Sequence, residues 1–311
     1  MTAVEQLLGI EYPILQGAMA NISTHKLVGP VSEAGGLGII GACGMSAEQL
    51  REEIRLTRAI TNKPFGVNLI LQMPNCDELV QVILEEGIGV VTTGARSPKK
   101  YMPIFKEAGI KVIPVIASVK HAIKMEAAGA DAVIAEGQEA GGHIGQTSSL
   151  SLLPQVVDAV AIPVLGAGGV GDGRSVVAMY ALGAQAIQVG TLFLSAEECP
   201  ISDRYRQFLL DANDTATIVT GRKAKEPVRS LRNSMLEQYA ALEEANAPHE
   251  ELEKLTVGSL ARAVHDGDIE TGSCMAGEIA GMIGNIRPAK QIIEELFAEA
   301  EAVLAKLRIK Y

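Results

Sequence analysis

The sequence predicts an α/β fold, a (β/α)8 TIM barrel that carries a small helical insertion near its C-terminal end. The first observation is that helix-forming stretches repeatedly end in Gly and are followed within a few residues by a short apolar run. Gly closes a helix in the left-handed conformation, and a short apolar run suits a parallel strand that is buried on both faces. The second observation is that eight candidate strands precede residue 190. Because a doubly wound sheet usually has fewer strands, this number favours a barrel with short connections.

The candidate strands and helices alternate along this part of the chain. Three strands are expected at residues 13–16, 65–69 and 162–165, and helices between strands are expected at 47–60 and 76–86, among others. The remaining five strands are expected directly after Gly35, Gly87, Gly109, Gly129 and Gly183. Such alternation is typical of a parallel sheet covered by helices.

The pattern changes after about residue 196. Residues 199–274 are charged and helical in pattern, as at 232–244 and 249–264, and we expect no strand there. We therefore divide the chain into a barrel of residues 1–198 and 275–311 and a helical insertion or lid subdomain of residues 199–274. Residues 286–310 are expected to form an amphipathic helix that packs on the barrel through Ile292, Ile293, Leu296, Phe297, Ala300, Val303 and Leu304.

Composition and charge narrow the class of protein. The chain has 311 residues, of which 48% are hydrophobic, and this argues for a large core and against disorder. A net charge of −10 argues against a general affinity for nucleic acid. No apolar stretch is long enough to span a membrane, and the first residues lack the pattern of a secretory signal, so we expect a cytoplasmic protein without membrane contact. The 4 cysteines have neither CxxC nor metal-ligand spacing, so neither a disulfide framework nor a metal site is expected.

Two glycine-containing turns at the end of the barrel suggest a phosphate site. Residues 166–171 satisfy GxGxxG, but a dinucleotide site would need an acidic residue about 20 positions later, where the sequence offers Gln188. In barrels, the turns after the last two strands often bind phosphate through backbone N–H groups. Here those turns contain Ala167, Gly168 and Gly169, and then Gly190 and Thr191. The alternative is that these glycines only form tight turns.

A histidine among glycines follows the sixth candidate strand. His143 lies within residues 135–145, at the end of a barrel strand where active sites are built, and an imidazole there can donate a proton or polarise a carbonyl. His25, His121, His249 and His265 lack such a setting and are interpreted as structural or solvated.

Other strand ends carry residues that suit a ring with mixed donors and acceptors. They are the segment 16–19 after the first strand, Asn68 at the third and residues 92–94 at the fourth. Cys43 follows the second strand but has no basic neighbour to activate it, which favours a packing role over a nucleophile. A local basic segment in this acidic chain is either a solvated surface or a docking site for an acidic partner or phosphate: Arg222, Lys223, Lys225, Arg229 and Arg232.

These motifs together resemble a known family. Residues 12–19, 33–41, 63–68, 91–95, 139–145, 167–169 and 188–191 are similar to the FMN-dependent barrel family of nitronate monooxygenases. Within that family, residues 132–145 and 267–277 look most similar to the flavin-dependent (type II) enoyl-acyl-carrier-protein reductases of bacterial fatty-acid synthesis. The resemblance covers nearly the whole chain, although its motifs distinguish poorly between the two activities.

The resemblance implies a homodimer of barrels that bind FMN and reduce the 2,3 double bond of an enoyl thioester, carried by acyl-carrier protein, with NADH or NADPH. It implies that His143 is the catalytic residue, that a monovalent cation activates the enzyme, and that the basic segment docks the carrier protein. The cofactor-binding residues that it implies are Ala18, Met19, Asn68, Thr93, Glu136, Gly141, Gly142, Ala167, Gly168, Gly169, Gln188, Gly190, Thr191 and Met275.

Three alternatives remain open from the sequence. A nitronate monooxygenase would use the same FMN site with His143 as a base on a nitronate or nitroalkane. A flavin- or phosphate-binding barrel would have no turnover, and an isomerase without flavin would act on a sugar phosphate.

Overall fold

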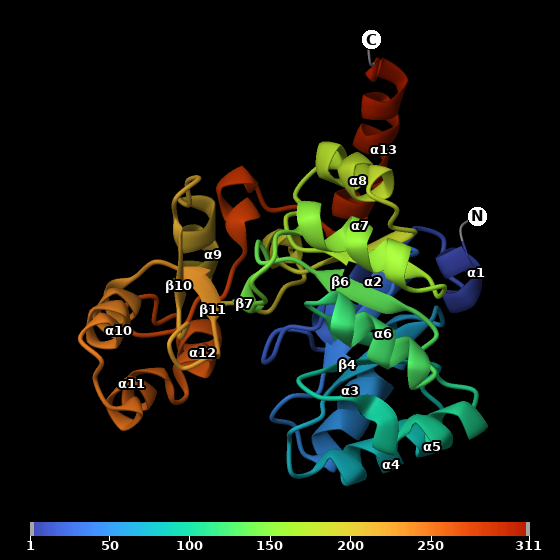
Figure 1. Ribbon diagram of the computed structural model, residues 1–311, viewed down its shortest axis with the longest axis horizontal. Helices are drawn as coiled ribbons and strands as arrows, with labels where there is room; N and C mark the ends of the chain where they lie inside the picture. The colour runs from blue at the N-terminus through green and yellow to red at the C-terminus, as the bar shows by residue number, and fades with distance from the viewer. Residues whose placement is uncertain (1–2, 309–311) are drawn as a thin grey trace.

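Eight parallel strands form the centre of the molecule in the computed structural model, which describes residues 3–308 (Figure 1). The strands neighbour one another in the order β1-β9-β8-β6-β5-β4-β3-β2, and a parallel bridge between Leu15 and Leu37 joins the two ends of this series. The predicted (β/α)8 barrel is therefore confirmed. Its strands are β1 (Ile14–Gln16), β2 (Gly38–Gly41), β3 (Phe65–Ile70), β4 (Val90–Gly94), β5 (Lys111–Ile116), β6 (Val133–Glu136), β8 (Val164–Ala167) and β9 (Ala186–Val189).

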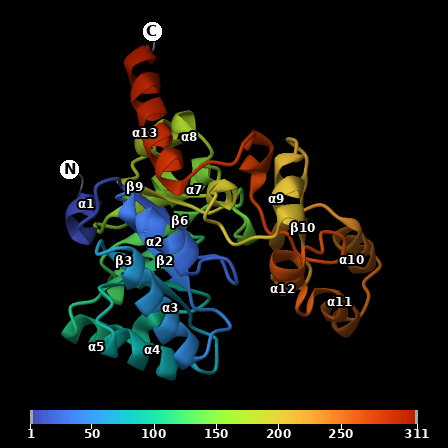
Figure 2. The same cartoon turned by 180° about the vertical axis from the view of Figure 1, so that it is seen from behind.

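Helices cover the outside of the barrel between successive strands (Figure 2). The glycines that the sequence marked as helix ends all have positive φ angles, between 61° and 99°, which confirms their role as helix stops. The elements that precede and surround the strands are α1 (Ala3–Leu8), α2 (His25–Glu33), α3 (Ala47–Ile60), α4 (Cys76–Glu85), the 3-10 turn η1 (Pro98–Lys100), α5 (Met102–Glu107), α6 (Val119–Ala127), α7 (Ser149–Ala159) and α8 (Gly173–Ala181).

Alternation along each strand separates two buried faces. One face fills the barrel with aliphatic side chains such as Leu15, Ile134 and Leu165. The other face packs against the helices, as Val67 and Val91 do. Since successive side chains of a strand point to opposite faces, the same alternation decides which side chain at each strand end reaches the barrel mouth.

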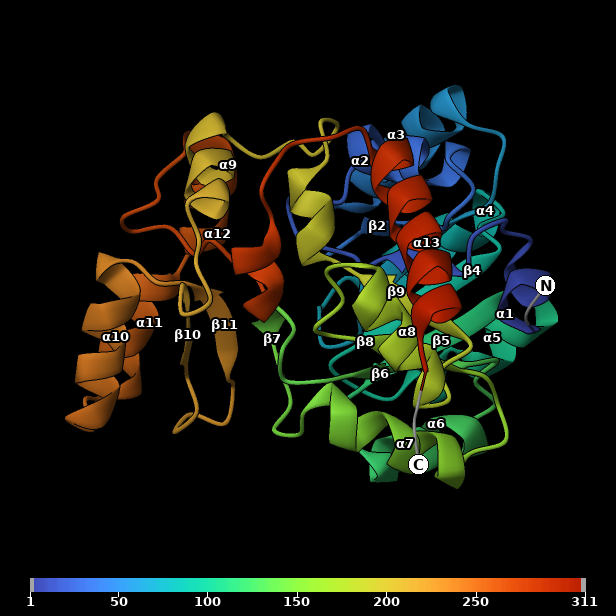
Figure 3. The same ribbon diagram turned by 90° about the horizontal axis from the view of Figure 1, so that it is seen from above.

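The insertion leaves the barrel after β9 and returns before the last helix, and Figure 3 shows it to one side of the barrel. Its two connections meet in a bridge between Ala196 and Arg287. Its core is continuous with the barrel core, because Tyr205, Leu231 and Val264 belong to the same cluster as Val133. The elements of the chain from the end of β9 onward are η2 (Thr191–Ser195), α9 (Asp203–Leu210), β10 (Thr217–Thr220), β11 (Val228–Leu231), α10 (Ser234–Glu244), α11 (His249–Thr256), α12 (Ser259–Ala261), the π-helical turn η3 (Arg262–Asp266), η4 (Glu278–Met282) and α13 (Ala289–Lys306).

The expectation of a purely helical insertion without strands is wrong. β10 and β11 pair as an antiparallel hairpin, and β11 pairs in turn with β7 (Gly142–His143), a short strand from a barrel loop. The helix expected at 249–264 is also interrupted, because Gly258 adopts a φ of 70° after α11 ends. The two strands of the hairpin have 4 residues each, and the pairing with β7 joins segments that are distant in sequence.

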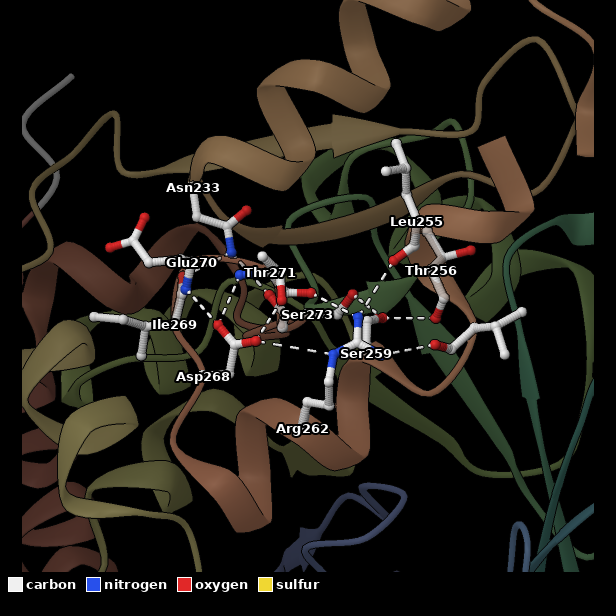
Figure 4. Close-up of polar contacts among 12 residues, drawn as sticks. Asn233, Leu255, Thr256, Ser259, Arg262, Asp268, Ile269, Glu270, Thr271 and Ser273 are labelled. Carbon is white, nitrogen blue, oxygen red and sulfur yellow. Dashed lines mark hydrogen bonds and ion pairs between the residues drawn. The ribbon is translucent and has the colours of Figure 1, made fainter. Parts of the chain in front are cut away.

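Side chains satisfy the backbone of the irregular segment that follows α11 (Figure 4). The Asn233 amide donates to the carbonyl oxygens of Ile269 and Gly272, both at 2.8 Å. The hydroxyls of Ser259 and Ser273 lie 2.7 Å apart, and the Arg262 guanidinium donates to the carbonyl oxygen of Thr271 and to two others nearby. Buried polar groups in such a segment are costly unless they are paired, so this network lets the chain turn without regular structure.

The last helix packs on α8, as expected of an amphipathic helix (Figure 1). Ile292, Ile293, Leu296 and Ala300 are buried, and Phe297 and Val303 are partly buried against the same core. Leu304, expected in that core, is instead 58% exposed, because the helix runs past the edge of α8 there. Residues 309–310 of the expected helix lie outside the described residues. None of the described helices has the length and apolarity needed to cross a membrane.

Replacing Leu296 by Ala is expected to lower the free energy of unfolding by about 2–5 kcal/mol, because the side chain is 3% exposed and its loss leaves a cavity between α13 and the barrel. Leu304→Ala on the same helix is the matched control, and we expect it to change the free energy by less than about 0.5 kcal/mol. Urea unfolding followed by circular dichroism measures both. Equal losses in the two variants would contradict the packing described for α13.

Candidate active site

Polar side chains gather on the inner face of the barrel at the C-terminal ends of the strands. Asn68 lies opposite Thr92 on the neighbouring strand, and its amide donates to the Thr92 hydroxyl at 2.9 Å. Glu136 lies opposite Ala167, and Ala167 lies opposite Gln188. These positions alternate with residues that pack against the helices, so their side chains extend the filled barrel interior toward its mouth. They make up an inner polar ring of Asn68, Thr92, Glu136 and Gln188.

Thr93 lies on the other face of β4. It follows Thr92 directly and shares the face of Val91, which packs against the helices. Its hydroxyl is buried and has no hydrogen-bond partner among the described residues. Thr92 therefore takes the position in the ring that the sequence led us to expect for Thr93, and the period-2 alternation of a strand was the signal that distinguishes the two.

Glu136 has an unusual electrostatic environment. Desolvation raises the pKa of its carboxyl group from 4.5 to about 7. Within the described part of the chain, no hydrogen-bond donor or basic side chain contacts this carboxylate, so nothing offsets the desolvation cost of its charge. A carboxyl group poised in this way exchanges a proton near neutral pH.

The two glycine turns present free backbone donors. Gly168 and Gly169 adopt φ angles of 86° and 81°, a conformation that favours glycine. The Ser149 hydroxyl lies 3.1 and 2.9 Å from the carbonyl oxygens of Ala167 and Gly168 and 2.9 Å from a Glu139 carboxylate oxygen, so its single hydrogen is shared among acceptors at the first turn. The N–H groups of Gly168, Gly169 and Gly190 have no acceptor among the described residues, as an anion site requires.

The helix that follows the GxGxxG segment is closed to an anion. The Asp172 carboxylate accepts from the backbone N–H groups of Arg174 and Ser175 at the start of α8. The Gly173 N–H donates to the Glu299 carboxylate at 2.9 Å. These carboxylates occupy the donors that a dinucleotide phosphate would use, which agrees with the lack of the acidic residue that a dinucleotide site would need near Gln188.

Thr191 links the second glycine turn to the returning segment, residues 275–278, which follows the insertion. Its hydroxyl oxygen accepts from the Gly277 N–H at 2.9 Å, which leaves the hydroxyl hydrogen available to a ligand. A Cβ at Gly141 would lie 2.6 Å from the carbonyl carbon of Ala276, and a Cβ at Gly142 would lie 3.6 Å from the Met275 sulfur. The returning segment therefore packs directly on the loop that carries His143.

Met19 completes the mouth on the opposite side of β9. A Cβ at Gly190 would lie 3.8 Å from the Met19 sulfur, and a Cβ at Gly17 would lie 3.2 Å from the Gln188 side chain. Ala18 packs against the cluster that fills the barrel. The turn after β1 thus adjoins both Gln188 and the second glycine turn.

His143 lies on a closed loop above this mouth. The Gln138 N–H donates to the Thr147 carbonyl oxygen at 2.9 Å and closes the neck of the loop formed by residues 138–147. In β7, His143 lies opposite Val228 of β11, and the Ile144 N–H donates to the Pro227 carbonyl oxygen at 3.0 Å. The imidazole itself is exposed. The sequence identified His143, but the strand that holds it could not be inferred from local pattern.

Only part of the basic segment found in the sequence lies on the surface of the molecule. Arg222, Lys223, Lys225 and Arg232 are exposed, whereas Arg229 is 7% exposed and pairs with Glu278 at 2.8 Å. Arg229 is therefore corrected from a surface residue to a buried one, because its position in β11 directs it toward the barrel loop. Cys43 is half-buried, and burial raises the pKa of its thiol, which agrees with a packing role.

Comparisons with known proteins agree with this geometry. Residues 1–79 and 74–299 match a family model described as nitronate monooxygenase. A (3aS,4S,5R,7aS)-5-hydroxy-7a-methyl-1-oxo-octahydro-1H-indene-4-carboxyl-CoA dehydrogenase from Mycobacterium tuberculosis is 32% identical over 339 residues, which cover 96% of each chain. A probable nitronate monooxygenase from Staphylococcus aureus is 32% identical over 345 residues, which cover 96% of this chain and 97% of the relative.

Solved structures extend the similarity over nearly the whole chain. FabK from Thermotoga maritima is 48% identical with a TM-score of 0.96, over 99% of this chain and 98% of that one. A nitroalkane oxidase from Streptomyces ansochromogenes is 30% identical with a TM-score of 0.87, over 99% of this chain and 100% of the other. With its barrel, its glycine turns and its full-length match, the chain belongs to the nitronate monooxygenase family.

Proposed function

We propose that this protein is an FMN-dependent oxidoreductase that reduces the 2,3 double bond of enoyl-acyl-carrier-protein thioesters with NADH or NADPH. The observation that carries the proposal is His143, held on a closed loop above a barrel mouth lined by polar side chains and free backbone donors. The 48% identity to FabK over nearly the full length supports the reductase over other activities of the family. The relative from Mycobacterium tuberculosis, whose name describes a CoA thioester, supports a thioester as substrate.

The residues at the mouth fit a flavin mononucleotide. The free N–H groups of Gly168, Gly169 and Gly190 suit its phosphate, and the Thr191 hydroxyl adds a donor. The amides of Asn68 and Gln188 suit the mixed donors and acceptors of its ring. Ala18, Met19, Glu136, Ala167, Gly141, Gly142 and Met275 surround the same mouth, and Thr92 takes the place first expected for Thr93.

A flavin held by these residues would supply hydride chemistry between the nicotinamide and the β-carbon of the enoyl thioester. His143 supplies the proton that the α-carbon then needs, or donates a hydrogen bond to the thioester carbonyl oxygen as negative charge develops there. The polar ring orients the cofactor, and the loop of residues 138–147 limits how far the imidazole moves from the mouth.

A nitronate monooxygenase is the second candidate, because the family model and the relatives from Staphylococcus aureus carry that name. In that reaction His143 would act as a base on a nitroalkane or nitronate, and oxygen would be consumed. Both candidates use one site, so the substrate that restores oxidised flavin distinguishes them.

We further propose that acyl-carrier protein docks on the exposed basic side chains around the β10–β11 turn. Arg222 and Lys225 lie there in a chain whose net charge is −10, and this contrast suits an acidic partner. We also propose that the protein acts as a homodimer, to be measured by light scattering, and that a monovalent cation stimulates it.

The first prediction concerns the reaction itself. We expect the purified protein to be yellow, to bleach when NADH or NADPH is added without oxygen, and to recolour when crotonyl thioester follows. Recolouring only with oxygen or a nitronate would establish the monooxygenase instead. A colourless protein that cannot take up FMN would contradict both candidates.

In the same assay, the flavin of His143→Ala is expected to bleach at the normal rate. The rate at which the thioester recolours it should fall roughly 10²–10⁴-fold, because only this second half-reaction needs the proton. His121→Ala, an exposed histidine on α6, is the control and should behave like the unaltered protein. Normal turnover in the His143 variant would leave the site without its proposed acid.

The second prediction uses the raised pKa of Glu136. The folded protein holds this proton up to about pH 7 and the unfolded chain only to 4.5, so the fold loses stability as pH rises between these values. Glu136→Gln, which carries no charge, should therefore be more stable than the unaltered protein above pH 7, by roughly 3 kcal/mol, with little difference below pH 4.5. Urea unfolding of flavin-free protein across this range measures the effect, with exposed Glu107→Gln as control.

The third prediction tests the docking surface. Replacing Arg222 and Lys225 together by Glu should raise the KM for carrier-bound substrate by roughly 3–10-fold and leave the KM for a CoA thioester unchanged. Lys120→Glu with Lys124→Glu on α6 makes the same change of charge at exposed positions elsewhere on the barrel. Equal effects of both pairs would indicate net charge rather than a local docking site.

A further inference from the structure

Arg229 is a buried cation where three segments of the chain meet. It lies in β11 opposite Gly142 of β7, the strand that Figures 1 and 3 show between the insertion and the barrel. Only 7% of the residue is exposed. Burial lowers the pKa of its guanidinium and the Glu278 carboxylate opposes this shift, so the group stays charged at a desolvation cost.

The guanidinium fork uses all three nitrogens. Nε and Nη2 donate to the carbonyl oxygen of Gln138 at 3.2 and 3.1 Å. Nη1 donates to the Thr217 hydroxyl at 3.0 Å, and Nη2 pairs with Glu278 at 2.8 Å. The contacts with β10 and the returning segment anchor the arginine, and the contact with Gln138 reaches the barrel loop.

Gln138 is the residue that closes the neck of the histidine loop. Its N–H donates to the Thr147 carbonyl oxygen, while its own carbonyl oxygen is the group that Arg229 binds. Between this neck and His143 lie Gly141 and Gly142, and Gly142 has a φ of 76°. A segment with two adjacent glycines does not hold a side chain in place by itself, so the position of His143 depends on what grips the loop on either side.

We propose that Arg229 is the positioning residue for His143: by binding the Gln138 carbonyl at the neck while β11 pairs with β7, it holds the imidazole over the barrel mouth. Residues of β11 thus hold the loop at two points. The Arg229 side chain binds the neck at Gln138, and the backbone of β11 pairs with β7 at the tip. The catalytic part of this inference rests on the proposed reduction of thioesters.

Lysine cannot replace the arginine here. A single ammonium group presents its donors from one point, whereas the planar fork reaches Gln138, Thr217 and Glu278 at once. Arg229→Lys retains the positive charge opposite Glu278. A defect in this variant therefore reflects loss of the hydrogen bonds to Gln138 at the loop neck rather than loss of the ion pair.

The test compares Arg229→Lys and Arg229→Met with Arg232→Met, an exposed arginine just beyond the same strand. Hydrogen exchange of residues 138–147 and the two half-reactions are measured on the flavin-loaded protein. We expect faster exchange in this loop in both Arg229 variants, a fall of roughly 10–100-fold in kcat for a CoA thioester, little change in its KM, and unchanged bleaching by NADH.

Loop exchange and kcat equal to those of Arg232→Met would overturn the proposal. Faster exchange throughout the insertion without a selective effect on the loop would also contradict it, because a positioning role must be local. If Arg229→Met does not fold, Arg229→Lys decides the question through the same measurements. Were the unaltered protein to reduce no thioester, the proposed function would fail, while hydrogen exchange would still show whether Arg229 fixes the loop.

Discussion

The backbone pairing between β7 and β11 is the constraint on which the candidate site depends. A barrel supplies a rigid ring of strand ends, but His143 is not on a strand of the barrel. It lies on a loop that leaves the barrel after β6, and the edge strand of a hairpin in the insertion pairs with it on either side of His143. The insertion is therefore part of the site, and its core merges with the barrel core through Tyr205 and Leu231.

The candidate site offers two kinds of polar group to a ligand: side chains in the inner polar ring and backbone N–H groups in the glycine turns. Asn68 and Thr92 satisfy each other, so they keep a fixed arrangement without a ligand. Glu136 has no such partner among the described residues, and burial raises the pKa of its carboxyl group to about 7. The backbone donors at the start of α8, in contrast, are taken by Asp172 and Glu299, whereas the N–H groups of the glycine turns have no acceptor among the described residues.

Much of this architecture was predictable because its signals are local. Glycines such as Gly35 and Gly183 end helices by their own conformational freedom, and five of the barrel strands follow from that punctuation, whereas β1, β3 and β8 were recognisable as short apolar runs. His143 was identifiable from its glycine-rich surroundings at a strand end. The failures concern interactions across long stretches of sequence: the β10–β11 hairpin, the exposure of Leu304 at the edge of α8, and the burial of Arg229 each depend on a distant partner. The choice of Thr93 over Thr92 is a different kind of error. The alternation of side chains along a strand would have indicated Thr92 from the sequence alone.

The order in which the chain is synthesised gains a meaning from the contacts of the histidine loop. All eight barrel strands are complete by Val189, yet the loop around His143 needs Val228 as its strand partner and Glu278 to anchor Arg229. The barrel strands of a growing chain can therefore pair before the contact partners of the histidine loop have been synthesised. The candidate site is therefore completed only after the barrel strands, and a chain that stops before Glu278 would lack the anchor of Arg229.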